Sequence, residues 1–247
     1  MFQPATGLSY QRFFRRLHAA HVFDWYLEIG CRTGRILDLV QGKTIGVDPV
    51  FRMQAPVLGR KPQLHLFQET SDAFFAADRL AALGARPVVS FIDGMHLFEF
   101  ALRDFIGIEA AASPDGVVYV HDCFPFDHAM TTRDLSNLPA IWTGDVWKLI
   151  PILQAHRPDL TLTALDAAPT GLLMIEGLDP ESRVLSDAMT DILGAYTELT
   201  LEEFGVERFF DLLGYTSADE VARNDVPSMA ARARPDLALD APQLVTP

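Results

Sequence analysis

Apolar and polar residues follow one another along this chain in blocks that predict strands alternating with helices. The apolar blocks are short, and helical periodicity fills most of the intervals between them. Strands that alternate with helices build a mostly parallel sheet in an α/β domain. The last two blocks flank Pro169-Thr170-Gly171 and predict a closing hairpin, which makes one strand antiparallel. The blocks predicted to be strands are 26–29, 44–47, 63–67, 87–93, 117–120, 160–165 and 172–175.

The same pattern divides the chain into four parts. Residues 1–23 predict an amphipathic helix that covers the sheet, and residues 24–180 predict the α/β core. Residues 181–223 predict a helical extension, and 224–247, which have few large apolar groups, predict a disordered tail. Within the core, residues 124–144 lack a clear period and predict a long loop over a functional site.

The segment 26–37 carries the first candidate motif. Glu28 ends an apolar run, Gly30 and Gly34 follow, and a helical pattern begins at Ile36. Glycines let a ligand approach the backbone, and a helix start offers unpaired N–H donors. Asp48 ends the next predicted strand, where a carboxylate accepts hydrogen bonds from a ribose diol. This spacing predicts a nucleoside-binding loop that differs from the Gly-x-Gly-x-x-Gly fingerprint of dinucleotide enzymes.

Polar residues also follow the other predicted strands. Ser71 comes after the third strand, where it borders a cofactor, caps a helix, or does both. Asp93 and His96 follow the fourth strand, and Asp122 follows the fifth. Ligands of open α/β sheets bind outside the carboxyl ends of the strands, so we expect these side chains to converge.

The segment Phe91-Ile92-Asp93-Gly94-Met95-His96-Leu97-Phe98-Glu99 resembles the Ile-Asp-Gly-x-His-x-Tyr-Glu pattern of one branch of class I S-adenosylmethionine-dependent methyltransferases. That branch includes macrocin-type O-methyltransferases, which act on macrolide sugars, and relatives of cephalosporin hydroxylase. The resemblance covers roughly residues 24–178, together with the Glu28-x-Gly30-x-x-x-Gly34 and Gly46-Val47-Asp48-Pro49 segments. It implies a Rossmann-like sheet of seven strands and transfer of a methyl group to the hydroxyl of a sugar or small metabolite.

The resemblance also implies roles for single residues. It makes His96 the base, although a histidine at a helix start also serves as a cap or core residue. It places a divalent metal, usually Mg²⁺, on Asp93 and Asp122. The branch often has two acids after the fifth strand, whereas this chain has His121-Asp122, and imidazole suits softer ions than magnesium. The residues that it implies for S-adenosylmethionine are Glu28, Gly30, Gly34, Asp48, Ser71 and Asp93.

The composition of the chain disfavours several classes of binding partner. The net charge of −13 repels phosphate backbones, which disfavours nucleic acid, and no apolar run is long enough to predict a membrane span or a secretory signal. Cys31 and Cys123 are the only cysteines, and their predicted positions at the ends of two different strands disfavour pairing. These features predict a protein of the reducing cytoplasm.

Two other functions stay compatible with the residues. Asp48 also suits the ribose of a nicotinamide cofactor, although the missing Gly-x-Gly disfavours an oxidoreductase. A cofactor-binding scaffold without turnover is the other alternative, and His121 in place of an acid is its main support.

Overall fold

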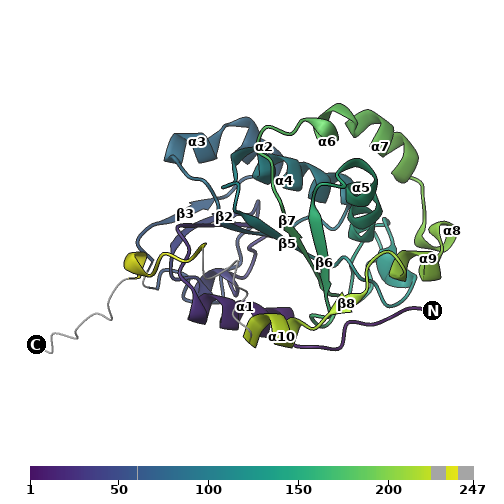
Figure 1. Cartoon of the computed structure of the whole chain (residues 1–247), viewed down its shortest axis with the longest axis horizontal. Coiled ribbons are helices and arrows are strands. Elements are labelled where there is room, and N and C mark those ends of the chain that lie inside the picture. Colours follow the sequence, from purple (N-terminus) through teal and green to yellow (C-terminus); the bar gives the residue numbers. More distant parts are fainter. Residues whose placement is uncertain (60, 224–231, 239–247) are drawn as a thin grey trace, which may run out of the picture.

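A computed structural model describes residues 1–59, 61–223 and 232–238 of the chain. It shows one mixed sheet with helices on both of its faces (Figure 1). The α/β prediction is confirmed, and so is its Rossmann-like, mostly parallel sheet with an antiparallel closing strand.

The sheet has the order β3-β2-β1-β4-β5-β7-β6-β8 in the described residues. Strands β3, β2, β1, β4 and β5 are parallel, whereas β7 is antiparallel to both β5 and β6. The predicted seven strands are all present, and a short eighth strand adds to the β6 edge. The strands are β1 Trp25–Ile29, β2 Lys43–Val47, β3 Leu64–Phe67, β4 Val89–Ile92, β5 Val117–His121, β6 Thr161–Leu165, β7 Leu172–Glu176 and β8 Tyr215–Thr216.

The helices form two outer layers (Figure 1). Helices α2 to α7 lie over one face of the sheet, and α1 and α10 lie together under the other. Their bounds are α1 Tyr10–Ala20, α2 Ser71–Ala76, α3 Arg79–Leu83, α4 Phe98–Ala111, α5 Leu149–His156, α6 Val184–Asp187, α7 Met189–Tyr196, α8 Leu201–Phe204, α9 Val206–Phe210 and α10 Ala218–Arg223.

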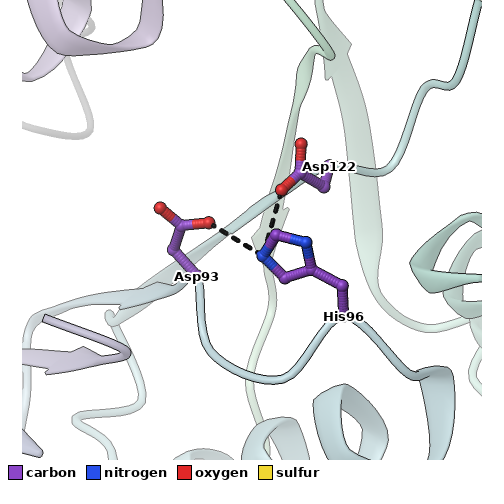
Figure 2. A group of neighbouring side chains, drawn as sticks. All are labelled: Asp93, His96 and Asp122. Atoms are coloured by element: carbon purple, nitrogen blue, oxygen red, sulfur yellow. Dashed lines mark ion pairs between the residues drawn. The ribbon is translucent and has the colours of Figure 1, made fainter. Parts of the chain in front are cut away.

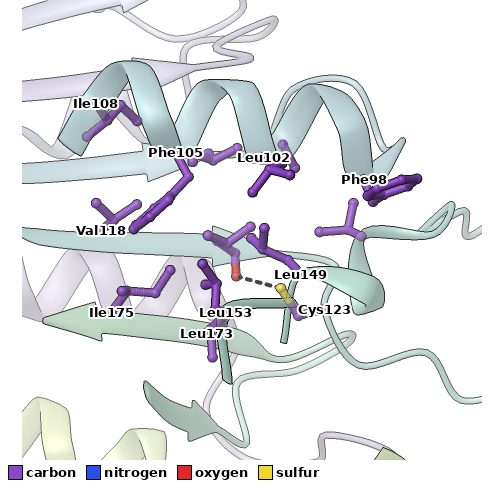
Figure 3. Packing of buried hydrophobic residues seen from close by; sticks show 14 of the residues in the cluster. Phe98, Leu102, Phe105, Ile108, Val118, Cys123, Leu149, Leu153, Leu173 and Ile175 are labelled. Carbon is purple, nitrogen blue, oxygen red and sulfur yellow. Dashed lines mark hydrogen bonds between the residues drawn. The ribbon is translucent and has the colours of Figure 1, made fainter. Parts of the chain in front are cut away.

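Each face of the sheet has its own apolar core. On the α4 side, Phe98, Leu102, Phe105 and Ile108 pack on strand residues such as Val118 (Figure 3). On the α1 side, the aromatic rings of Phe13 and Phe14 pack against Phe91 and Tyr119 from the sheet. Burial of such large side chains on both faces stabilises the sheet, and it explains why the strands are apolar along nearly their whole length.

Several element bounds differ from the predictions. The N-terminal helix begins at Tyr10, because Ser9 caps it and residues 7–9 instead pair with the chain around Ala168. Asp78, whose φ of 51° lies in the left-handed region, separates α2 from α3. Cys31 and Cys123 are both buried and unpaired.

The predicted tail 224–247 is described only over 232–238, where Pro235–Leu237 form a 3-10 turn; its other residues lie outside the described residues. Residues 124–144 are described throughout and contain only a 3-10 turn at Ala129–Thr131. Among the described helices, none has both the length and the apolar character needed to cross a membrane.

Candidate functional site

The carboxyl ends of β1, β2, β4 and β5 open into a cleft of about 660 Å³. The α1 helix closes one side with Tyr10 and Gln11, and Trp142 of the long loop contributes from another. The predicted site residues that line the cleft are Glu28, Gly30, Asp48, Ser71, Asp93, His96 and Asp122, whereas Gly34 does not line it.

The glycine loop differs most from its prediction. Residues 30–42 are all described, and they contain a 3-10 turn at Leu37–Leu39 in place of the expected helix. The predicted N–H donors of a helix start are therefore missing. Gly30 and Gly34 have φ values of 89° and 75°, and the space beside each is taken by protein. A Cβ on Gly30 would overlap the Asp93 carbonyl, and one on Gly34 would overlap the side chains of Val57 and Met53.

Asp48 ties this loop to the sheet. Its Oδ2 accepts the backbone N–H of Arg32 at 2.8 Å, and its Oδ1 accepts that of Val50 at 2.7 Å. A carboxylate has about four acceptor positions, so Asp48 keeps room for a further donor from the cleft. Asp48 therefore combines a structural role with exposure to the cleft.

Glu28 is almost fully buried at the base of the cleft. Its Oε2 accepts the hydroxyl of Tyr26 at 3.0 Å. Burial raises the pKa of Glu28 well above its ordinary value, and the nearby Asp93 and Asp48 add to the rise, which outweighs the Tyr26 hydrogen bond. Burial therefore favours the protonated form of this side chain.

Ser71 does not cap its helix, because the side chain of Thr70 accepts the N–H of Ala73 instead. The hydroxyl of Ser71 is hydrogen-bonded to Asp104. Asp104 of α4 is 2% exposed, and its Oδ1 has no hydrogen-bond partner among the described residues. Burial raises the pKa of Asp104 to about 7, because α4 turns this carboxyl inward under the floor of the cleft.

Asp93, His96 and Asp122 converge at the centre (Figure 2). His96 Nε2 lies 3.2 Å from Asp122 Oδ2 and 3.6 Å from Asp93 Oδ1. His96 Nδ1 lies 2.7 Å from the carbonyl oxygen of Trp142, so Nδ1 carries a hydrogen and Nε2 is the reactive nitrogen. Burial favours the neutral ring, but the two carboxylates outweigh it and raise the pKa of His96 to about 9.

His121 approaches the same two carboxylates from the sheet side. Its Nδ1 lies 3.2 Å from Asp93 Oδ1 and 3.3 Å from Asp122 Oδ2. Burial favours its neutral form, but Asp122 and Asp93 outweigh burial and raise the pKa of His121 to about 10. The two imidazoles in turn hold the pKa of Asp93 well below its usual range, against the effect of burial.

Asp122 itself has a strained backbone with a φ of 60°, which Asp tolerates better than most residues. Thr170, from the loop between β6 and β7, donates its hydroxyl to Asp122 Oδ1 at 2.5 Å. Thr170 and the Trp142 carbonyl were not predicted, since both reach the cleft from loops without a motif. Tyr10 was also missed, and its ring lies 4.1 Å from that of His121.

No protein-family model matches the chain, and no curated protein matches it. Solved structures with similar folds include the MycE methyltransferase of the mycinamycin pathway in complex with Mg, SAH and mycinamycin VI (16% identity, 70% of this chain, 49% of that chain, TM-score 0.44). They also include TomG from Streptomyces achromogenes in complex with SAM (17% identity, 68% of this chain, 79% of that chain, TM-score 0.47).

A third similar structure is an O-methyltransferase from Bacillus cereus in complex with SAH (15% identity, 67% of this chain, 79% of that chain, TM-score 0.48). The match to MycE spans about half of the length of that enzyme. At these identities the likeness concerns the fold, and the ligands named are those of the other proteins.

Proposed function

We propose that this chain transfers a methyl group from S-adenosylmethionine to a hydroxyl oxygen of a sugar or small metabolite. One observation carries the proposal: a nucleoside-type carboxylate, Asp48, and an acid–base cluster share one cleft of about 660 Å³. That volume lies within the range of pockets that enclose small ligands. The cleft therefore has room for a cofactor and for the reacting part of an acceptor.

The cofactor end lies at β1, β2 and the start of α2. Asp48 has acceptor positions left for a ribose diol, and Ser71 offers a hydroxyl at the cleft wall. The buried carboxyl of Glu28 adds a further polar group. Gly30 contributes backbone at the same wall, whereas Gly34 shapes the loop from outside the cleft.

The reacting end lies at Asp93, His96 and Asp122. A methyl sulfonium is a good donor, so the remaining tasks are to align the acceptor hydroxyl and to take its proton. We assign proton removal to His96 Nε2, because the Trp142 carbonyl orients this nitrogen into the cleft. The positive sulfonium beside the ring lowers its affinity for a proton and readies Nε2 for this role.

The same residues fit a divalent metal. One ligand atom from each of Asp93, His96 and Asp122 lies within 4.8 Å of the others, and carboxylate oxygens suit Mg²⁺. Asp93 and Asp122 would hold the ion, which when bound lowers the pKa of a coordinated hydroxyl. Proton removal by His96 and binding of the cofactor, as described above, use protein groups alone.

Calorimetric titration of the protein with S-adenosylhomocysteine and, separately, with NAD tests the proposal. We expect micromolar or tighter binding of S-adenosylhomocysteine and none of NAD. Asp48→Asn should weaken that binding at least tenfold, while Asp38→Asn, a matched change on the exposed 3-10 turn, should leave it unchanged. Binding of NAD alone, or equal binding by both variants, contradicts the assignment.

A further inference from the structure

The two imidazoles of the cleft are held in matching ways. His96 Nδ1 is bonded to the Trp142 carbonyl, and His121 Nε2 lies 3.2 Å from Thr170 Oγ1. Each ring thus has its outer nitrogen engaged by a loop. Each points its inner nitrogen at Asp93 Oδ1 and Asp122 Oδ2. Histidines that bind metals have this arrangement, in which the second nitrogen is anchored by a hydrogen bond.

The hydroxyl of Thr170 determines which nitrogen of His121 carries a hydrogen. A hydroxyl has one hydrogen, and a carboxylate only accepts, so the hydrogen of Thr170 goes to Asp122 Oδ1. The Thr170 oxygen must then accept from His121 Nε2–H. In the neutral ring this leaves the lone pair on Nδ1, which faces the two carboxylate oxygens.

The donor separations fit a small four-coordinate ion. Bonds of about 2.0–2.2 Å in tetrahedral geometry place neighbouring donors about 3.3–3.6 Å apart. His121 Nδ1 lies 3.2 Å from Asp93 Oδ1 and 3.3 Å from Asp122 Oδ2, close to that spacing. Octahedral Mg²⁺, with bonds of about 2.1 Å, places neighbouring donors about 3.0 Å apart, which is shorter than both separations.

The surroundings of His121 and His96 suit the two rings to different roles. The His121 side chain is 7% exposed and lies under the Tyr10 ring, whereas the His96 side chain is 20% exposed. His121 therefore faces the carboxylates and little else, while His96 faces the space that an acceptor would enter. A base must reach its substrate, whereas a ligand need only reach the ion.

We propose that His121 is a metal ligand through Nδ1, with Asp93 and Asp122, and that Thr170 holds it in the ligating tautomer. Because imidazole favours the later first-row transition ions over Mg²⁺, the site prefers Co²⁺ or Zn²⁺. The inference rests on the metal site of the proposed function and adds its third donor. The Nδ1 proton of the ion-free ring must leave when the ion binds.

Titration of chelator-treated full-length protein with CoCl₂ and with MgCl₂ tests the proposal, with the visible Co²⁺ spectrum as the record of coordination. We expect wild type to bind Co²⁺ at least tenfold more tightly than Mg²⁺. His121→Asp should reduce that ratio at least tenfold, because it replaces a nitrogen donor by oxygen. Asp38→Asn, an exposed control on the 3-10 turn, should keep the ratio and the spectrum.

Thr170 supplies a second pair of variants. Thr170→Val should weaken Co²⁺ binding about tenfold, in the range typical of lost outer hydrogen bonds, and Thr170→Ser should restore it. Loss of Co²⁺ binding in His96→Gln with retention in His121→Asp overturns the proposal, and so does an unchanged ratio in His121→Asp. Binding of S-adenosylhomocysteine, measured on the same samples, tests the proposed function separately.

Discussion

Two groups of acids and bases adjoin where the backbone N–H of Asp145 donates to the His96 carbonyl, and only one of them is built for chemistry. The cleft cluster consists of Asp93, His96, His121 and Asp122. The Asp145 cluster consists of Glu99, Arg133, Asp145 and Lys148, and it anchors the end of the long loop to α4. Both clusters contain two carboxylates and two bases, so composition alone does not distinguish them.

In the Asp145 cluster all four carboxylate oxygens accept hydrogen bonds, and the side-chain donors are permanently charged groups. Asp145 Oδ2 accepts from Arg133 at 2.6 Å and from Lys148 at 2.7 Å, and its Oδ1 accepts the N–H of Phe98 at 2.8 Å. Arg133 also forms a two-pronged pair with Glu99. No reactive nitrogen is left facing open space, so this group acts as a structural framework.

In the cleft cluster two nitrogens instead share the same two oxygens. His96 Nε2 and His121 Nδ1 both face Asp93 Oδ1 and Asp122 Oδ2, at a point that opens into the cleft. Such sharing is favourable only with a proton or a cation between the groups. The comparison teaches that titratable nitrogens on shared carboxylate oxygens beside a cavity identify the reactive group, whereas sharing of an acceptor alone does not.

Removal of the reactive nitrogen should have the largest effect. His96→Ala should lower methyl transfer by about 10² to 10⁴-fold, the usual contribution of a positioned base. The free energy of unfolding should change by less than about 1 kcal/mol, because His96 is partly exposed beside the cleft. Radiolabelled methyl transfer to a hydroxyl acceptor and urea unfolding measure the two effects. Turnover within threefold of wild type would leave His96 as a structural residue.

Removal of Asp145, the central acid of the Asp145 cluster, should lower stability strongly while leaving cofactor binding intact. Asp145→Ala leaves the ammonium of Lys148, which is 1% exposed, without its carboxylate. Breaking such a buried pair costs about 3–5 kcal/mol, so the urea midpoint should fall strongly. Cofactor binding by the folded fraction should persist. A stability loss below about 1 kcal/mol would show that Asp145 is not part of a framework.

The sequence predicted the strands and the acids at the strand ends, because apolar blocks and polar ends are local signals. It misplaced the helix after Gly34, since Gly42 packs on the Phe23 carbonyl and the chain must enter β2 at Lys43. A 3-10 turn at Leu37–Leu39 occupies that interval.

The contacts that orient the two histidines of the cleft could not be predicted from the sequence. Trp142 meets His96 across 46 positions, and Thr170 meets His121 across 49. Neither partner belongs to a motif, and both contacts exist only once the loops have closed. The burial of Asp104 was missed for a related reason, because its helix packs on α2 as well as on the sheet.

Asp104 is a buried acid that forms no ion pair among the described residues, in contrast to Asp145, which pairs with Arg133 and Lys148. Its pKa is raised from 3.8 to about 7, so the folded state binds a proton that the unfolded state releases between those values. Stability should therefore fall as pH rises from about 4 to 7, by at most about 4 kcal/mol at 1.36 kcal/mol per pKa unit. Asp104→Asn should remove this dependence and stabilise the protein at pH 8 by about 2 kcal/mol, measured by urea unfolding at pH 5 and 8. Equal pH dependence in both proteins contradicts burial as the cause.

The smallest effect on the free energy of unfolding should come from an exposed ion pair, Arg103–Asp72, whose geometry resembles that of Arg133–Glu99. Arg103 donates to Asp72 at 2.7 and 3.0 Å, much as Arg133 does to Glu99, but the two side chains are 35% and 45% exposed. Water and salt screen such a pair, so Arg103→Gln should cost less than about 1 kcal/mol, and 1 M NaCl should remove most of the difference. Urea unfolding at low and high salt measures both. A cost above about 2 kcal/mol that persists in salt would mean that two-pronged geometry, rather than burial, gives the Asp145 cluster its strength.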